Sequence, residues 1–166
     1  MKKITIVLFL ALSFGLTTSV FAQGGRAPAP PLMDLTTAKA LVDAATAEAR
    51  ANNANVAIAV VDANGDLVNF NRMDDASAQA VTSSQGKARA AILFGLPTKA
   101  AADAVAAGTP LSATLTPSGA GAFPVTVQQG GLPIIKDGKV IGGIGIGGSS
   151  SANDEMFAQK AIDSIK

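Results

Sequence analysis

The chain has 166 residues, a formal net charge of +1 and only 15% charged residues. This length suits one domain with its own core, and the charge balance excludes the strongly basic surface that nucleic-acid binding requires. The sequence contains no histidine, cysteine, tryptophan or tyrosine. It therefore excludes disulfides, thiolate nucleophiles, zinc–thiolate sites and imidazole bases, and leaves carboxylates, lysine, hydroxyls, backbone amides or a cofactor.

Residues 1–22 have the pattern of a secretory signal peptide. Lys2 and Lys3 precede a short apolar run, and Val20 and Ala22 fit a cleavage site after Ala22. The apolar run is too short to span a bilayer comfortably. We therefore expect a secreted or periplasmic protein without stable membrane insertion after cleavage.

The remaining chain divides into a tether and one domain. Residues 23–33 are rich in proline and glycine, which predicts a disordered or extended tether before a domain over residues 34–166. Apolar residues recur at helical spacing over 36–51. Alternating residues then predict strands over 56–62 and 67–73, joined by a turn at Asn64 and Gly65.

The second half of the domain repeats this alternation of helices and a hairpin. Two helices are expected over 76–94 and 98–107, a hairpin over 132–136 and 139–146, and a last helix over 151–166 capped by Ser151. Residues 108–131 are rich in Gly, Pro, Ser and Thr, with strand character only around Val125 and Val127, and predict a long functional loop. This order predicts an α/β (α+β) fold with an antiparallel sheet and helices packed on it.

The last predicted strand has one nearly bare face, which carries Gly143, Gly145 and Gly147. Glycines in a strand allow a close approach, either by a helix or partner subunit or by a flat ligand. Gly143, Gly145 and Gly148 also match G-x-G-x-x-G. A dinucleotide site is not expected, because that fingerprint needs a further strand after the helix.

Three ordered sequence blocks carry a family resemblance. They are VDANGDL at 61–67 with RMD at 72–74, KARAA at 87–91 with FGLPT at 94–98, and GGLPI at 130–134 with DGKVIGGIG at 137–145. The set resembles the GlcG/HbpS family. The resemblance implies a profilin-like α/β/α fold with a central antiparallel sheet, homo-oligomers, and extracytoplasmic haem binding or haem degradation in some members.

Haem as a cofactor would bind here without a histidine ligand. Haem iron is usually held by His, Cys, Met or Tyr, of which only methionines remain. We expect Met33, Met73 and Met156 to be packing residues, and the resemblance transfers no axial ligand. No metal site is expected, because no full set of oxygen ligands is apparent.

Two cations and several glycines are the candidate site residues. Lys87 is a candidate base or anion clamp, and Arg72 could hold a carboxylate, although either could instead form an ion pair. Asp62 is expected at a turn, and Asp154 and Glu155 at a helix start. The complete candidate ligand-binding set is Arg72, Met73, Lys87, Gly130, Gly131, Gly143 and Gly145.

Three functions remain open at this level. The first is an exported binding protein for a small molecule, with haem or a related planar or anionic ligand implied by the resemblance. The second is an enzyme acting on a small carboxylate or carbonyl compound, with Lys87 as base or clamp and amides near Gly130 and Gly131 as oxyanion donors. The third is a structural oligomeric module, and a homo-oligomer is expected because Gly- and Ala-rich faces can pack against copies of themselves.

Overall fold

A computed structural model describes residues 33–113 and 124–166. The expected signal peptide, most of the expected tether and residues 114–123 of the expected loop lie outside the described residues. The elements in chain order are α1 (Leu35–Ala51), β1 (Ala57–Asp62), β2 (Leu67–Arg72), α2 (Ala78–Phe94), α3 (Thr98–Ala106), β3 (Gly131–Lys136), β4 (Lys139–Gly147) and α4 (Ser151–Asp163).

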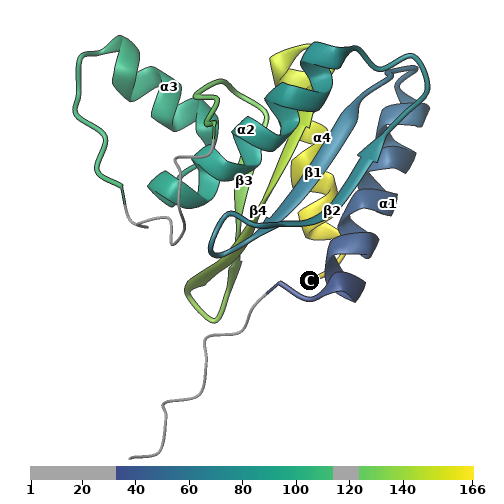
Figure 1. Ribbon diagram of the computed structural model, residues 1–166, viewed down its shortest axis with the longest axis horizontal. Coiled ribbons are helices and arrows are strands. Elements are labelled where there is room, and N and C mark those ends of the chain that lie inside the picture. The colour runs from purple at the N-terminus through teal and green to yellow at the C-terminus, as the bar shows by residue number, and fades with distance from the viewer. Residues whose placement is uncertain (1–32, 114–123) are drawn as a thin grey trace, which may run out of the picture.

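The strands form one antiparallel sheet in the order β2-β1-β4-β3. Each predicted hairpin therefore forms, and the two hairpins join through the pairing of β1 with β4. Helices α1 and α4 pack on one face of the sheet and α2 packs on the other (Figure 1). This arrangement confirms the expected α+β fold with an antiparallel sheet between helical layers.

The main core lies between the sheet and the layer formed by α1 and α4. The predicted apolar stripe of α1 is buried there, with Leu41 fully enclosed. It meets Ile144 and Ile146 from β4 and Phe157 from α4, all fully buried. The alanines of α1 allow the helix to lie close to the strands, because at those positions only a methyl group separates the helix from the sheet.

The opposite face of β4 carries the glycines and packs against α2. A Cβ atom added at Gly143 would lie 2.6 Å from the carbonyl oxygen of Ala88, and one at Gly145 would collide with the carbonyl oxygen of Ser84. The backbones of strand and helix are therefore in direct contact. Of the two uses predicted for this bare face, helix packing is the one that the structure contains, and α2 occupies the space that a flat ligand would need.

Details at the element ends differ from the sequence predictions. The cap of α4 is Ser150, whose hydroxyl accepts from the amide of Asn153, and the predicted cap Ser151 is the first helical residue. Val125 and Val127 lie in a described segment without strand structure. Helix α3 stands apart from the layers, with only Thr98 and Ala101 buried (Figure 1).

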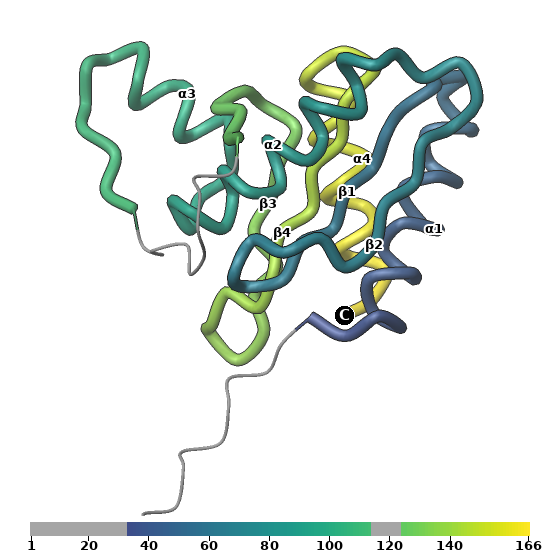
Figure 2. Tube along the Cα trace, in the orientation of Figure 1, coloured from purple at the N-terminus to yellow at the C-terminus, as the bar shows by residue number. Residues whose placement is uncertain are grey.

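The two ends of the described chain lie near each other. The last residues after α4 reach the start of α1 beside the sheet (Figure 2). Among the residues that the structure describes, no helix has the length and apolarity needed to cross a bilayer.

Candidate functional site

Lys87 and Asp154 form a buried ion pair between α2 and α4. The Nζ atom of Lys87 lies 2.9 Å from Oδ2 of Asp154 and 2.8 Å from the carbonyl oxygen of Ile146. The residues are 2% and 1% exposed, respectively. Asp154 was expected as an acid at a helix start, and the structure adds a second role because it is the counter-ion of Lys87.

Burial raises the pKa of Asp154, while the hydrogen bond and charge of Lys87 and the amide of Ser149 act in the opposite direction. Both Asp154 oxygens are engaged, since Oδ1 accepts from the Ser149 amide at 3.1 Å. Lys87 in turn contacts two oxygen acceptors, which require N–H donors. This geometry suits a hydrogen-bond donor or anion clamp, and it gives no support to Lys87 as a base.

The Gly130–Gly131 turn lies against this ion pair. Lys87 and the two glycines are therefore close together, as the enzyme hypothesis requires. Gly130 has φ +121°, and a Cβ atom there would lie 2.8 Å from the Lys87 Nζ atom. The Gly131 amide donates to the hydroxyl of Thr98 at 2.8 Å. Because this amide already has an acceptor, it is not available as the oxyanion donor that the enzyme hypothesis assigned to it.

A polar pocket of about 260 Å³ opens beside Lys87 and Asp154. It lies where α2 and α4 both begin, so the first amides of two helices border it. We call it the polar pocket. Its lining consists of Ser77, Gln79, Ala80, Ser83, Lys87, Gln128, Gly148, Ser149, Ser151 and Asp154.

Arg72 and Met73 lie elsewhere, at the end of β2. The Arg72 guanidinium donates from Nε and Nη2 to the carbonyl oxygen of Ala76, at 2.9 and 2.6 Å. Met73 packs partly buried against the main core. Both residues line a separate polar depression with Arg50 and Asn55. The candidate set is therefore split: Lys87, Gly130 and Gly131 converge, Arg72 and Met73 form a second location, and Gly143 and Gly145 lie under α2.

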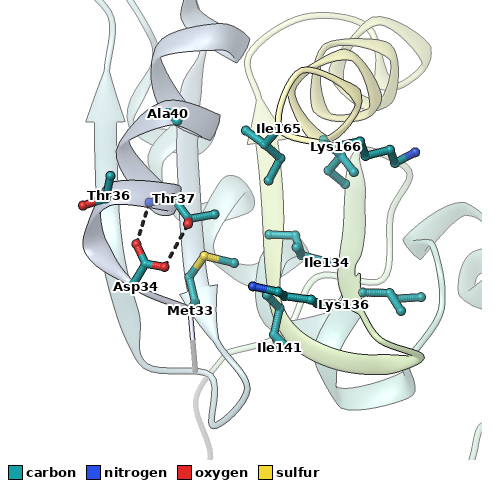
Figure 3. A pocket seen from close by; sticks show the side chains of 12 residues that line it. Met33, Asp34, Thr36, Thr37, Ala40, Ile134, Lys136, Ile141, Ile165 and Lys166 are labelled. Carbon is teal, nitrogen blue, oxygen red and sulfur yellow. Dashed lines mark hydrogen bonds between the residues drawn. The ribbon is translucent and has the colours of Figure 1, made fainter. Parts of the chain in front are cut away.

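An apolar groove of about 390 Å³, larger than the polar pocket, lies between the start of α1, the β3–β4 hairpin and the end of α4. We call it the apolar groove. Met33 is 5% exposed and points its thioether into it, and the Lys136 side chain extends across it toward Met33 (Figure 3). The aliphatic walls come from Ile134, Ile135, Ile141, Ile162 and Ile165.

The sequence prediction did not identify the apolar groove. Met33 was placed in the tether, yet it is buried against β4. A signal was present, because an apolar residue directly before the helix cap Asp34 is the position that packs back onto the first turn. Met156 also packs against the main core, as expected.

Comparison with known proteins agrees with the motif blocks and with the fold. A family model described as haem degrading protein HbpS-like matches residues 33–163. The chain is 38% identical to Protein GlcG of Escherichia coli over 109 residues, 66% of this chain and 76% of that protein.

Two solved structures share the architecture. A double mutant of Streptomyces reticuli HbpS has a TM-score of 0.74 at 25% identity, covering 92% of this chain and 99% of that chain. A PduOC–haem complex has a TM-score of 0.70 at 29% identity, covering 81% of this chain and 96% of that chain. The predicted resemblance is therefore confirmed, and the chain belongs to the HbpS-like family.

Proposed function

We propose that this protein binds haem or a related planar, carboxylate-bearing ligand in the apolar groove. The family membership and the haem complex formed by the related PduOC support a haem-class ligand. The groove volume of about 390 Å³ falls within the range of about 300–1,000 Å³ that is usual for small-molecule sites. The polar pocket lies below that range and has few apolar walls, so it suits a smaller ligand.

The residues of the apolar groove fit such a ligand in three respects. The isoleucine walls provide an apolar slot for a flat ring system. Among the residues that the structure describes, Lys136 forms no ion pair and would pair with a carboxylate at the mouth, whereas the ammonium of Lys166 already contacts Asp163 at 2.6 Å. Met33 is the thioether in the groove, and thioethers are among the ligands of haem iron.

The chemistry differs from that of a histidine-ligated haem protein. Because the sequence holds no histidine, cysteine or tyrosine, the groove offers the iron the thioether of Met33 and, as rarer ligands, the amines of Lys136 and Lys166. Haem would supply redox and oxygen chemistry when bound, while the protein residues bind and orient it. The observation that carries the proposal is the buried thioether facing an isoleucine-lined groove with a lysine across its mouth.

Titration of haemin into the protein tests this function. We expect saturable binding with a shifted Soret band. Met33→Leu keeps the apolar volume and removes the sulfur, so it should retain binding while changing the spectrum of the bound iron. Absence of saturable binding to the unmodified protein would overturn the proposal.

We also propose that the protein is exported and acts outside the cytoplasm. The support is the charged, apolar and small-residue pattern of residues 1–22. The absence of cysteine is compatible with an oxidising compartment.

A homo-oligomer is proposed on a separate observation. Helix α3 stands apart from the sheet layers, and Leu96 just before it and Val105 within it are 41% and 56% exposed. Association of copies would bury such residues. Sedimentation analysis should therefore show an assembly, and a monodisperse monomer would contradict this part of the proposal.

A further inference from the structure

We infer that the polar pocket is a second ligand site, built to bind a small oxyanion carried by a carboxylate or a phosphate group. This inference is independent of haem binding. The polar pocket lies at the start of α4 and the apolar groove at its end, and 13 helical residues separate them by about 20 Å.

The first step rests on the buried ammonium of Lys87. An ammonium group has three N–H donors. Two of them are used by Asp154 and by the carbonyl oxygen of Ile146. Within residues 33–113 and 124–166 no third acceptor is recorded, and Lys87 forms part of the pocket wall. The ammonium is thus already held by two acceptors, and an oxygen atom bound in the pocket would add a third hydrogen bond from the same buried charge.

The second step concerns the charge of the pocket. Asp154 is the only acidic residue among the described residues that line the pocket, and both of its oxygens already accept hydrogen bonds from Lys87 and Ser149. Its negative charge is therefore compensated within the protein. A bound anion would therefore meet the Lys87 ammonium rather than an uncompensated carboxylate.

The third step concerns further hydroxyl donors that border the same space and have no acceptor among the residues that the structure describes. The hydroxyl of Ser77 accepts from the Ala80 amide and that of Ser149 from the side chain of Asn153, so each has its own O–H to donate. Ser151 and Gln128 also line the pocket.

Two helix starts add to these donors. Helices α2 and α4 begin at the pocket, and their first-turn amides and dipoles favour negative charge. The lining is thus rich in donors and poor in apolar surface, which selects an oxyanion over an apolar ligand.

The test titrates the protein with sodium acetate and, separately, with sodium phosphate, at an ionic strength held constant with chloride. The readouts are the ammonium resonance of Lys87 and the amide resonances of Ser149 and Ser151 in NMR spectra. Saturable shifts of these resonances with either salt support the inference, and the salt that saturates them identifies the group bound. Absence of saturable shifts with both salts would overturn it.

A matched pair of variants separates binding in the pocket from a general charge effect. Ser151→Asp places a carboxylate in the pocket at a helix position where an acid is favourable, so the fold should be retained. It should weaken oxyanion binding at least about tenfold. Ala152→Asp adds the same charge on the same turn at an exposed residue outside the lining, and should weaken binding by less than about threefold. Equal weakening by both variants would contradict the assignment.

Discussion

The Nζ atom of Lys87 lies 2.9 Å from Oδ2 of Asp154, in a region where each side chain is at most 3% exposed. The two residues are 67 positions apart in the sequence, and their contact joins α2 to α4 across the end of β4. Since α2 and α4 lie on opposite faces of the sheet, this ion pair links the two helical layers. It also forms one wall of the polar pocket, so it connects the stability of the fold with the inferred oxyanion site.

Removing one partner of this ion pair should destabilise the protein strongly. In Asp154→Asn the Lys87 ammonium stays buried without its counter-charge, and the free energy of unfolding should fall by about 3–5 kcal/mol. The double variant Lys87→Met with Asp154→Leu removes both charges and should recover most of that loss. Urea unfolding of the double variant and of its two single variants, Lys87→Met and Asp154→Leu, measures this coupling.

An exposed pair provides the control for the ion-pair prediction. Lys99 contacts Asp103 on the surface of α3, and Lys99→Met should leave the unfolding midpoint nearly unchanged. If the loss of free energy of unfolding in the double variant equals the sum of the losses in its two single variants, Lys87 and Asp154 are not energetically coupled.

The free energy of unfolding of the Lys87→Met variant should depend on pH, in a direction that follows from the titration of Asp154. Lys87 lowers the pKa of Asp154 against the effect of burial, so its removal raises that pKa further above the model-peptide value of 3.8. The folded state then binds the Asp154 proton more tightly than the unfolded state. The contribution of Asp154 to the free energy of unfolding is therefore fully present below pH 3.8 and is lost as the pH rises through the raised pKa.

Unfolding measured over a series of pH values checks this prediction. The variant Lys87→Met with Asp154→Asn lacks the carboxyl group and provides the baseline for all other titrating groups. The free energy of unfolding of Lys87→Met should fall with pH relative to this baseline. If it rises instead over the same pH interval, the account of the buried Asp154 carboxyl is contradicted.

The contact between β4 and α2 predicts a large effect of a single methyl group at Gly145. An added Cβ atom there would collide with the carbonyl oxygen of Ser84 and the amide nitrogen of Ala88, which are both backbone atoms and cannot rotate away. We expect Gly145→Ala to reduce the free energy of unfolding by about 3 kcal/mol, at the upper end of overpacking costs.

Gly138→Ala is the matched control for this effect. Apart from its two chain neighbours, no described residue comes within 4 Å of a Cβ atom added there, so the φ of +72° is what penalises a side chain. That penalty is about 1 kcal/mol. Denaturant unfolding compares the two, and a Gly145→Ala protein as stable as Gly138→Ala would show that α2 does not approach β4 so closely.

The sequence predicted the elements well because local periodicity determines them. The bounds of β2 and α3 differ from the prediction by one residue each, and the glycine face of β4 has the packing role that was one of its two predicted uses. The site was predicted less completely. Lys87 and Gly130, which the enzyme hypothesis grouped, do lie close together in the fold. The ion-pair partner of Lys87 is Asp154, which lies on a helix distant in the sequence, and no local sequence pattern encodes such a contact.

The division of the other candidates also has a physical cause. Arg72 ends an edge strand, so its guanidinium reaches the following turn at Ala76 rather than the centre of the fold. The apolar groove was missed because it forms between three segments, the start of α1, the β3–β4 hairpin and the end of α4. Only the fold brings Met33 and Ile165 together.

Export should be visible as removal of the first 22 residues. The intact mass of the protein from an extracytoplasmic fraction should correspond to a chain that begins at Gln23. Ala22→Arg replaces the small residue at the expected cleavage site and should leave the precursor uncut. A full-length, soluble protein found only in the cytoplasm would contradict the proposed export.

The central claim, a haem-class ligand in the apolar groove, is tested most directly by filling that groove. Ala40 is an exposed residue of α1 that lines the groove, and Ala47 is an exposed residue about two turns further along the same helix, outside the lining. In haemin titrations we predict that Ala40→Trp weakens binding at least about tenfold while Ala47→Trp retains the affinity of the unmodified protein. Equal affinities for the two variants would contradict placement of the ligand in the apolar groove.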